Sequence, residues 1–404
     1  MSRLRATAAA ATLLLALPLS VAAAAPALAA PPVNSATSPT GQATQTIQAT
    51  QATAPVELPR PTGPFAVGEE VLHLVDQNRP DPWVPSAGPR QLMVSMYYPA
   101  RAGTGTPAPH MTPAAARALL DGKLPGNTLP TEAVSGTRTW AESGARPQGS
   151  HYPLVVLSPG FTMPRATLSG LAEDLTSHGY VVAVIDHTYE NTGTTFPDGR
   201  TLPCEACGKV DGSDDKASAL LEAGRAKDVS FVIDQLTNRP HPAWRYARLI
   251  DRDRIGMAGH SAGGASTVPA LLTDDRIRAG VNLDGTMHYL VPESGLKGKP
   301  FMMIGHPLDN GRQDSTWVTS FARLDGWKRL LTVDGSDHGS FTDLPVFFDG
   351  LGIPKGPHTT IDGRRAVAVT RQYVGAFFDL QLKGIPQPLL DGPSAAYPEV
   401  RFTP

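Results

Sequence analysis

Apolar positions recur along most of this chain in two alternating patterns. Short apolar runs bounded by turn residues predict strands. These runs cover residues 92–98, 154–157, 181–185, 254–258, 279–283, 300–305 and 328–333. Between them, apolar residues at helical spacing predict helices, at about 113–120, around 168–175, at about 216–236 and at about 366–382. Strands that alternate with helices predict a mainly parallel central sheet with helices on both faces.

The N-terminal 58 residues lack this alternation. Residues 1–29 predict a secretory signal, with two arginines, an Ala/Leu-rich stretch and the small-x-small cleavage pattern Ala27-Leu28-Ala29. A retained membrane anchor is the weaker alternative, because the stretch is dominated by alanine and ends in that pattern. Residues 30–58, rich in Ser, Thr, Gln and Pro, predict a flexible linker. We therefore expect a secreted protein whose folded domain covers 59–404.

Composition adds little to this description. The chain has 404 residues, of which 41% are hydrophobic and 18% charged, with a formal net charge of -2. These values are typical of a globular protein and offer no basis for a nucleic acid or an anionic membrane as its main partner. Beyond the signal segment no apolar run approaches the ~18 residues of a spanning helix. The oligomeric state stays open.

The segment Gly259-His260-Ser261-Ala262-Gly263 has the pattern G-x-S-x-G between a predicted strand and a predicted helix. In this context the pattern indicates a sharp turn that exposes a serine nucleophile, and it predicts the α/β-hydrolase fold. An inconsequential Gly/Ser loop is the alternative, and the preceding apolar strand disfavours it. Pro269 requires the helix after Ser261 to be short or kinked.

A serine nucleophile needs a base, and in this fold the chain order is serine, acid, histidine. His338 follows the strand at 328–333 through a Gly/Ser/Asp loop, where the last parallel strand would bring a base over the serine. His306 and His358 have weaker positions.

Two aspartates compete for the acid. Asp284 directly ends the strand at 279–283, and Asp309 follows the strand at 300–305. Position alone leaves them balanced. Asp337 is a weaker third candidate, because adjacent loop residues such as Asp337 and His338 seldom orient each other.

The two cysteines form a C-x-x-C pair, Cys204 and Cys207, in a polar loop. A redox motif would need a strand–turn–helix context, and a metal site would need further ligands. In an exported protein a local disulfide that braces the loop is the favoured interpretation.

Five segments carry a family resemblance: YPLVVLSPGF at 152–161, SHGYVVA at 177–183, GHSAGG at 259–264, NLDG at 282–285 and HGSFTD at 338–343. Together they resemble the plasma and type II intracellular platelet-activating-factor acetylhydrolases. The resemblance implies Asp284 as the acid and His338 as the base, which makes Asp309 a surface or pocket residue. For the oxyanion hole, the fold implies the backbone N–H groups of Phe161 and Ala262.

Two departures from the family concern the substrate pocket. Gly285 and Thr286 follow the acid where animal members carry a bulkier Ala-Trp, and the loop 188–215 has no clear counterpart. The resemblance implies a lipase or esterase acting on lipid-type esters, without metal or cofactor. A cutinase-like polyester hydrolase is the alternative, and a non-catalytic hydrolase-fold binding protein is a third.

Overall fold

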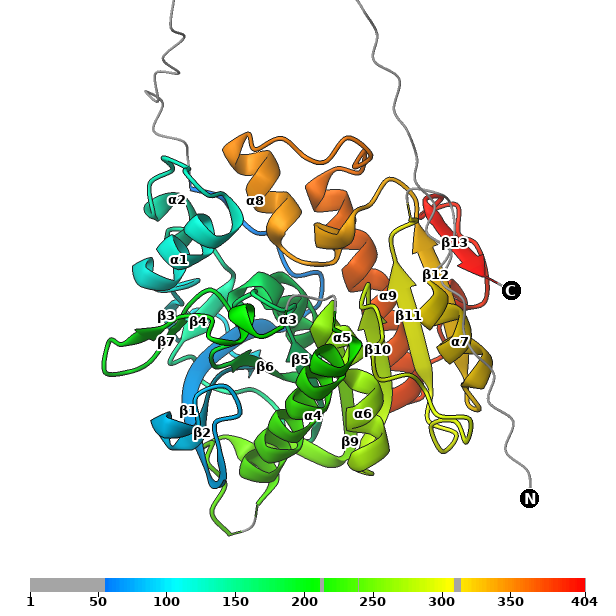
Figure 1. Ribbon diagram of the computed structural model, residues 1–404, viewed down its shortest axis with the longest axis horizontal. Coiled ribbons are helices and arrows are strands. Elements are labelled where there is room, and N and C mark those ends of the chain that lie inside the picture. The colour runs from blue at the N-terminus through cyan, green and yellow to red at the C-terminus, as the bar shows by residue number, and fades with distance from the viewer. Residues whose placement is uncertain (1–54, 211–213, 239, 309–313, 404) are drawn as a thin grey trace, which may run out of the picture. The chain divides into compact units, whose positions relative to one another are not determined.

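The computed structural model describes residues 55–403 except 211–213, 239 and 309–313 (Figure 1). The predicted signal segment, most of the predicted linker and Asp309 lie outside the described residues. Within the described part of the chain, no helix combines the length and the apolar character needed to cross a bilayer.

A central sheet of eleven strands organises the fold, in the order β13-β12-β11-β10-β9-β5-β6-β2-β1-β4-β3. The strand bounds are β1 Ala66–Pro80, β2 Pro89–Ala100, β3 Thr106–Pro107, β4 Ala141–Ser143, β5 Tyr152–Ser158, β6 Val181–His187, β9 Ile250–His260, β10 Ile277–Leu283, β11 Phe301–Gly305, β12 Lys328–Val333 and β13 Val400–Thr403. The six neighbouring strands from β12 to β6 are parallel, and β2 and β13 flank them in antiparallel pairing. The predicted, mainly parallel sheet is confirmed.

Helices cover both faces of this sheet, as predicted (Figure 1). The helix bounds are α1 Pro113–Lys123, α2 Glu132–Ser135, α3 Ser169–Ser177, α4 Asp215–Thr237, α5 Ala262–Ala265, α6 Thr267–Thr273, α7 Ser315–Arg323, α8 Leu344–Leu351 and α9 Gly363–Lys383. One core contains residues of α4 and α6, and the other contains residues of α3 and α9. The helix after Ser261 is divided at Ser266 into α5 and α6, which fits the requirement that Pro269 imposes.

Local sequence explains where the two long helices begin and end. The side chain of Asp214 accepts hydrogen bonds from the first backbone N–H groups of α4, and Asp362 does the same for α9. Gly384, with φ 68°, ends α9 in the left-handed conformation that glycine adopts without strain.

A third, smaller core joins the start of the described chain to α1 and α8. Val56 and Leu58, at the end of the predicted linker, are 5% and 0% exposed in this core. The packed part of the chain therefore includes the last residues that composition assigns to the linker. The apolar side chains of Val56 and Leu58 are buried in the third core, although most of their neighbours in the linker are polar.

Candidate active site

Ser261 lies in a sharp turn between β9 and α5, with φ 55° and ψ -126°. This conformation is strained for a residue with a side chain, by about 1–3 kcal/mol. A Cβ at Gly259 would lie 2.3 Å from the carbonyl carbon of Gly263, and one at Gly263 would lie 2.0 Å from the carbonyl oxygen of Ser158. The turn therefore has the close backbone packing that the G-x-S-x-G pattern predicts.

The imidazole of His338 joins Ser261 to Asp284. Its Nε2 lies 3.0 Å from Oγ of Ser261, and its Nδ1 lies 2.6 Å from Oδ2 of Asp284. These residues follow β12, β9 and β10, so three parallel strands bring them to the same edge of the sheet. The side chain of Asp284 is 6% exposed and that of His338 is 53% exposed. Three predicted site residues thus form one hydrogen-bonded chain that runs inward from the surface.

A second histidine, His306, also binds Asp284. Its Nδ1 lies 2.8 Å and 2.7 Å from the two carboxylate oxygens, and its backbone N–H donates to Oδ1 at 2.8 Å. Burial opposes ionisation of Asp284, but hydrogen bonds from His306 and His338 outweigh it and hold the pKa of this carboxyl below its usual value. The sequence indicates His306 only as a weaker base. Its position at the end of the strand beside β10 is the signal for this contact.

His260, the residue before Ser261, supports the loop of His338. Its Nε2 lies 2.7 Å from the backbone carbonyl oxygen of His338, and the centroids of the two rings are 4.7 Å apart. Burial, together with the nearby His338, lowers the pKa of His260 to about 3. The neutral ring donates its Nε2–H to the carbonyl oxygen and fixes the loop without adding a charge beside the ring of His338.

Phe161 and Ala262, the predicted oxyanion-hole residues, both line a cavity beside Ser261. Ala262 is the first residue of α5, so no preceding helical turn offers an acceptor for its N–H. Phe161 lies in the loop after β5, where the next residue, Thr162, has φ 66° and donates its N–H to the carbonyl oxygen of Glu190 at 2.8 Å. Both residues lie in the expected region, and their role as oxyanion donors stays a prediction.

Buried charged side chains of α4 bind the loop after β5. Arg225 of α4 is 1% exposed, donates to the carbonyl oxygen of Pro159 at 2.5 Å and pairs with Glu190 at 2.7 Å. Asp228, almost one helical turn further along, pairs with the equally buried Arg90 at 2.7 Å. Because each charge has a partner inside the protein, this network ties the loop to α4.

The cavity beside Ser261 has a volume of about 350 Å³. Its lining comprises Phe161, Val210, Ser218, Leu221, Glu222, Ser261, Ala262, Thr286, His288 and His338. No lysine or arginine is among these described lining residues. The volume lies within the range of about 300–1,000 Å³ typical of small-molecule sites.

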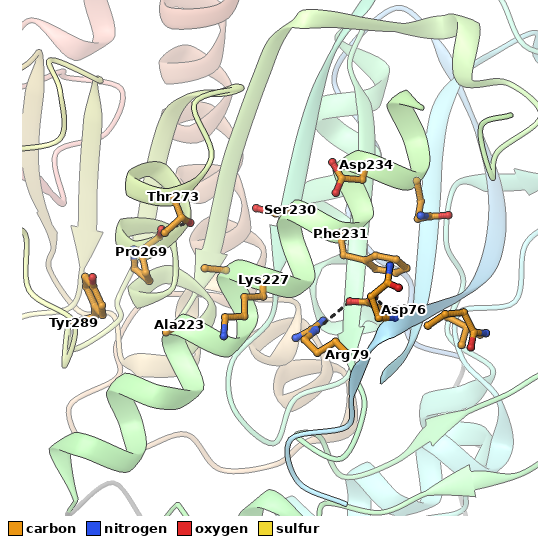
Figure 2. A pocket seen from close by; sticks show the side chains of 15 residues that line it. Asp76, Arg79, Ala223, Lys227, Ser230, Phe231, Asp234, Pro269, Thr273 and Tyr289 are labelled. Atoms are coloured by element: carbon orange, nitrogen blue, oxygen red, sulfur yellow. Dashed lines mark hydrogen bonds and ion pairs between the residues drawn. The ribbon is translucent and has the colours of Figure 1, made fainter. Parts of the chain in front are cut away.

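A larger cavity of about 760 Å³ lies between β1, α4 and α6 (Figure 2). It shares no described lining residue with the cavity beside Ser261. Arg79 and Asp76, drawn in Figure 2, form an ion pair of 3.1 Å at its wall. Ser230 also lines it, but no histidine does among the residues that the structure describes. A serine–histidine pair is therefore found in the smaller cavity and not in this one.

Asp337 has other partners than His338. Its Oδ1 lies 2.8 Å from the hydroxyl of Ser340, and its Oδ2 accepts from the hydroxyl of Thr359 at 2.7 Å. This carboxylate caps the 3-10 turn that carries His338 and does not orient its ring. Asp309 lies outside the described residues, so its place relative to the site stays untested.

Among the described residues, Asp284, His306 and His338 form the one cluster with the compactness of a metal site. Their N–O separations of 2.6–2.8 Å are hydrogen-bond lengths, and Nε2 of His338 already contacts Ser261. A metal ion would have to replace these hydrogen bonds, so the cluster suits proton transfer better than metal binding.

The predicted disulfide between Cys204 and Cys207 is confirmed. It lies in the loop after the small hairpin of β7 (Thr194–Thr195) and β8 (Thr201–Leu202). Within this turn, Ala206 donates its N–H to the carbonyl oxygen of Tyr189 at 2.9 Å. The crosslink therefore braces the loop, and a redox or metal role is not needed to explain the pair.

Comparison with known proteins gives one family. Residues 50–201 and 242–383 match the family described as platelet-activating factor acetylhydrolase, isoform II. A probable 1-alkyl-2-acetylglycerophosphocholine esterase of Arthroderma benhamiae is 30% identical over an alignment of 376 residues. The match covers 85% of this chain and 93% of that protein. Cutinase 2 of Thermobifida cellulosilytica is 27% identical over 47% of this chain and 62% of its own length.

Among solved structures, a ferulic acid esterase from Streptomyces cinnamoneus is similar with a TM-score of 0.77 and 42% sequence identity. The match covers 87% of this chain and 100% of that one. The same fold, the serine turn and a family match over most of the sequence agree. This chain belongs to the platelet-activating factor acetylhydrolase isoform II family and is a carboxylic ester hydrolase with the α/β-hydrolase fold.

Proposed function

We propose that Ser261 is the nucleophile of this hydrolase, with His338 as its base and Asp284 as the residue that orients the base. The observation that carries the proposal is the hydrogen-bond chain from Ser261 Oγ through His338 to Asp284, with lengths of 3.0 Å and 2.6 Å. Asp284 keeps the proton on Nδ1 of His338, which leaves Nε2 to accept the serine proton.

Catalysis then proceeds in two halves. Oγ of Ser261 attacks the ester carbonyl carbon while Nε2 of His338 takes the hydroxyl proton, and the tetrahedral oxyanion accepts hydrogen bonds from the N–H groups of Phe161 and Ala262. The intermediate collapses, and the alcohol leaves with the proton from His338. Water, deprotonated by His338, attacks the acyl-enzyme, and the acid product leaves Ser261 free. Each oxyanion donor contributes on the order of 10²–10³ in turnover.

For the substrate we propose lipid-type esters with a compact acyl group, as the name of the Arthroderma benhamiae relative suggests for that protein. The cavity of about 350 Å³ has room for such a group. An uncharged ester suits it better than a phosphate held inside it, because its described lining lacks lysine and arginine.

Hydroxycinnamate esters are a second candidate. The ferulic acid esterase is 42% identical over its whole length, well above the identity of the other two relatives compared. A cutinase-like activity on polyesters stays the third candidate, supported by 27% identity over about half of this chain.

We also propose that the protein is secreted after cleavage before Ala30. The disulfide between Cys204 and Cys207 supports this, since such bonds persist in oxidising compartments. Expression of the full chain, followed by N-terminal sequencing of protein from the medium, should give Ala30 as the first residue. Retention of Met1 on cell-bound protein would contradict export.

A substrate panel tests the proposed activity. Initial rates are measured on p-nitrophenyl esters from acetate to dodecanoate, on methyl ferulate and on a polyester film, for the wild type and Ser261→Ala. We expect the wild type to hydrolyse short acyl esters fastest, and Ser261→Ala to lose all these activities. A wild type that hydrolyses none of them would support the non-catalytic binding protein instead.

A further inference from the structure

A second histidine–carboxylate pair, His288 and Glu222, lines the cavity beside Ser261. Glu222 projects from α4, and His288 lies in the loop that follows Asp284 after β10. The side chain of Glu222 is 2% exposed and that of His288 is 19% exposed. Neither takes part in the hydrogen-bond chain at Ser261, so the proposed catalytic steps leave this pair without a role.

Glu222 fixes the ring of His288 in one tautomer. Its Oε1 accepts the backbone N–H of His288 at 3.1 Å and lies 2.9 Å from ring Nδ1, and its Oε2 accepts the N–H of Tyr289 at 2.7 Å. A carboxylate surrounded by three nitrogens acts as acceptor for each, so Nδ1 of His288 carries a proton. In the neutral ring Nε2 is then a hydrogen-bond acceptor.

This acceptor has no good partner within the described protein. Oδ1 of Asp215 lies 3.9 Å from Nε2, which is beyond hydrogen-bond length, and the Asp215 side chain is 91% exposed. Its carboxylate is also an acceptor and cannot donate to Nε2. The rest of the lining combines the apolar side chains of Phe161, Val210, Leu221 and Ala262 with the polar side chains of Ser218, Ser261, Thr286 and His338. An acceptor in such surroundings gains most from a donor that a ligand brings.

We propose that His288 is a specificity-determining residue whose Nε2 accepts a hydrogen bond from a hydroxyl group of the ester substrate. The inference rests on the proposed function, because it assigns the cavity beside Ser261 to the substrate. The shared chemistry is an O–H donor, carried either on the acyl part, as in a phenolic acid, or on the alcohol part, as in a glycol ester. Buried Glu222 is the positioning residue that holds the ring for this contact.

Matched ester pairs measure the contact directly. Methyl 4-hydroxycinnamate against methyl cinnamate places the hydroxyl on the acyl part, and 2-hydroxyethyl butyrate against ethyl butyrate places it on the alcohol part. For one pair the wild type should favour the hydroxylated ester by about 5-fold in kcat/KM, as expected for one neutral hydrogen bond. His288→Phe, which keeps a ring of similar size, should bring that ratio close to one, and His288→Gln, which keeps an acceptor, should restore part of it.

Controls separate this contact from a general defect. Hydrolysis of p-nitrophenyl acetate, which has no hydroxyl, reports whether His288→Phe keeps its fold and its triad. Because each ratio compares two esters on the same variant, a general change in its rate cancels. His358→Phe alters an exposed histidine outside the cavity and should keep the wild-type ratios. Both ratios unchanged in His288→Phe, with active enzyme, would overturn the inference and leave the proposed function intact. A wild type inactive on every ester would overturn the proposed function and this inference with it.

Discussion

Replacing Asp284 with asparagine tests the proposed orientation of the base. The carboxylate faces three N–H groups, the backbone N–H and ring Nδ1 of His306 and the ring Nδ1 of His338. An amide has one oxygen and one NH₂ group, so Asp284→Asn points a donor at one of these nitrogens. If it faces His338, the ring takes the other tautomer, with the proton on Nε2, and can no longer accept from Ser261.

The size of the effect follows from this tautomer change. The geometry stays nearly isosteric, while the reactive tautomer and the charge that stabilises the imidazolium are both lost. For the same substitution in a serine protease triad the loss in kcat is on the order of 10⁴, about 5 kcal/mol of transition-state stabilisation. We expect a loss of 10³–10⁴ here, because the 2.6 Å contact between Asp284 and His338 has the same arrangement.

The assay is the saturated rate on p-nitrophenyl acetate, with the melting temperature as a check of folding. Asp309→Asn and Asp337→Asn are the matched controls, since each removes one of the other candidate acids. Both should retain activity within about 10-fold of the wild type. A variant of Asp284 that keeps wild-type turnover, together with an Asp309 variant that loses it, would refute the assignment.

Three further predictions concern the surroundings of the triad. His260 has a pKa of about 3 in the folded protein against about 6.5 in the unfolded chain, so the unfolded chain binds its proton more readily. Its contribution to stability is therefore present above pH 6.5 and is lost as the pH falls toward 3. In urea unfolding, the free energy of unfolding of His260→Gln should depend less steeply on pH than that of the wild type. Arg225→Met leaves Glu190 with one buried partner fewer and should lower the free energy of unfolding by about 3–5 kcal/mol, against little change for exposed Lys227→Met on the same helix. His306→Phe should lower kcat by about 10-fold and raise the lower pKa of the pH–rate profile. The reason is that the Asp284 carboxylate loses a hydrogen bond worth about 1.5–3 kcal/mol. An unchanged profile would contradict the role of the contact between His306 and Asp284.

The central strands could be predicted because a strand buried on both faces has a continuous apolar run that stands out locally. β1 has no such run: in Ala66–Pro80 apolar and charged residues mix, since it lies toward the edge of the sheet and Val71 is 50% exposed. The sequence pattern does not predict helix α8 either. Its apolar residues follow the histidine loop closely, and their burial depends on the third core.

The site residues also divide into those that a local sequence pattern predicts and those that depend on contacts between distant segments. The serine turn is a local pattern, and chain order leads from Ser261 to His338. The contact of His306 with Asp284 joins the ends of two strands across 22 residues. The contact of His288 with Glu222 joins the loop after β10 to α4 across 66 residues. Sequence spacing alone does not reveal such contacts, because they arise only when the sheet order brings the loops together.

Labelling by a fluorophosphonate probe tests the central claim, that Ser261 is the nucleophile, most directly. The intact protein is treated with the probe, digested, and the modified peptide is identified by mass spectrometry. We predict a single modification on Ser261, labelling that stops in Ser261→Ala, and loss of ester hydrolysis in parallel with labelling. Modification of another residue, or ester hydrolysis that persists in Ser261→Ala, would contradict the account.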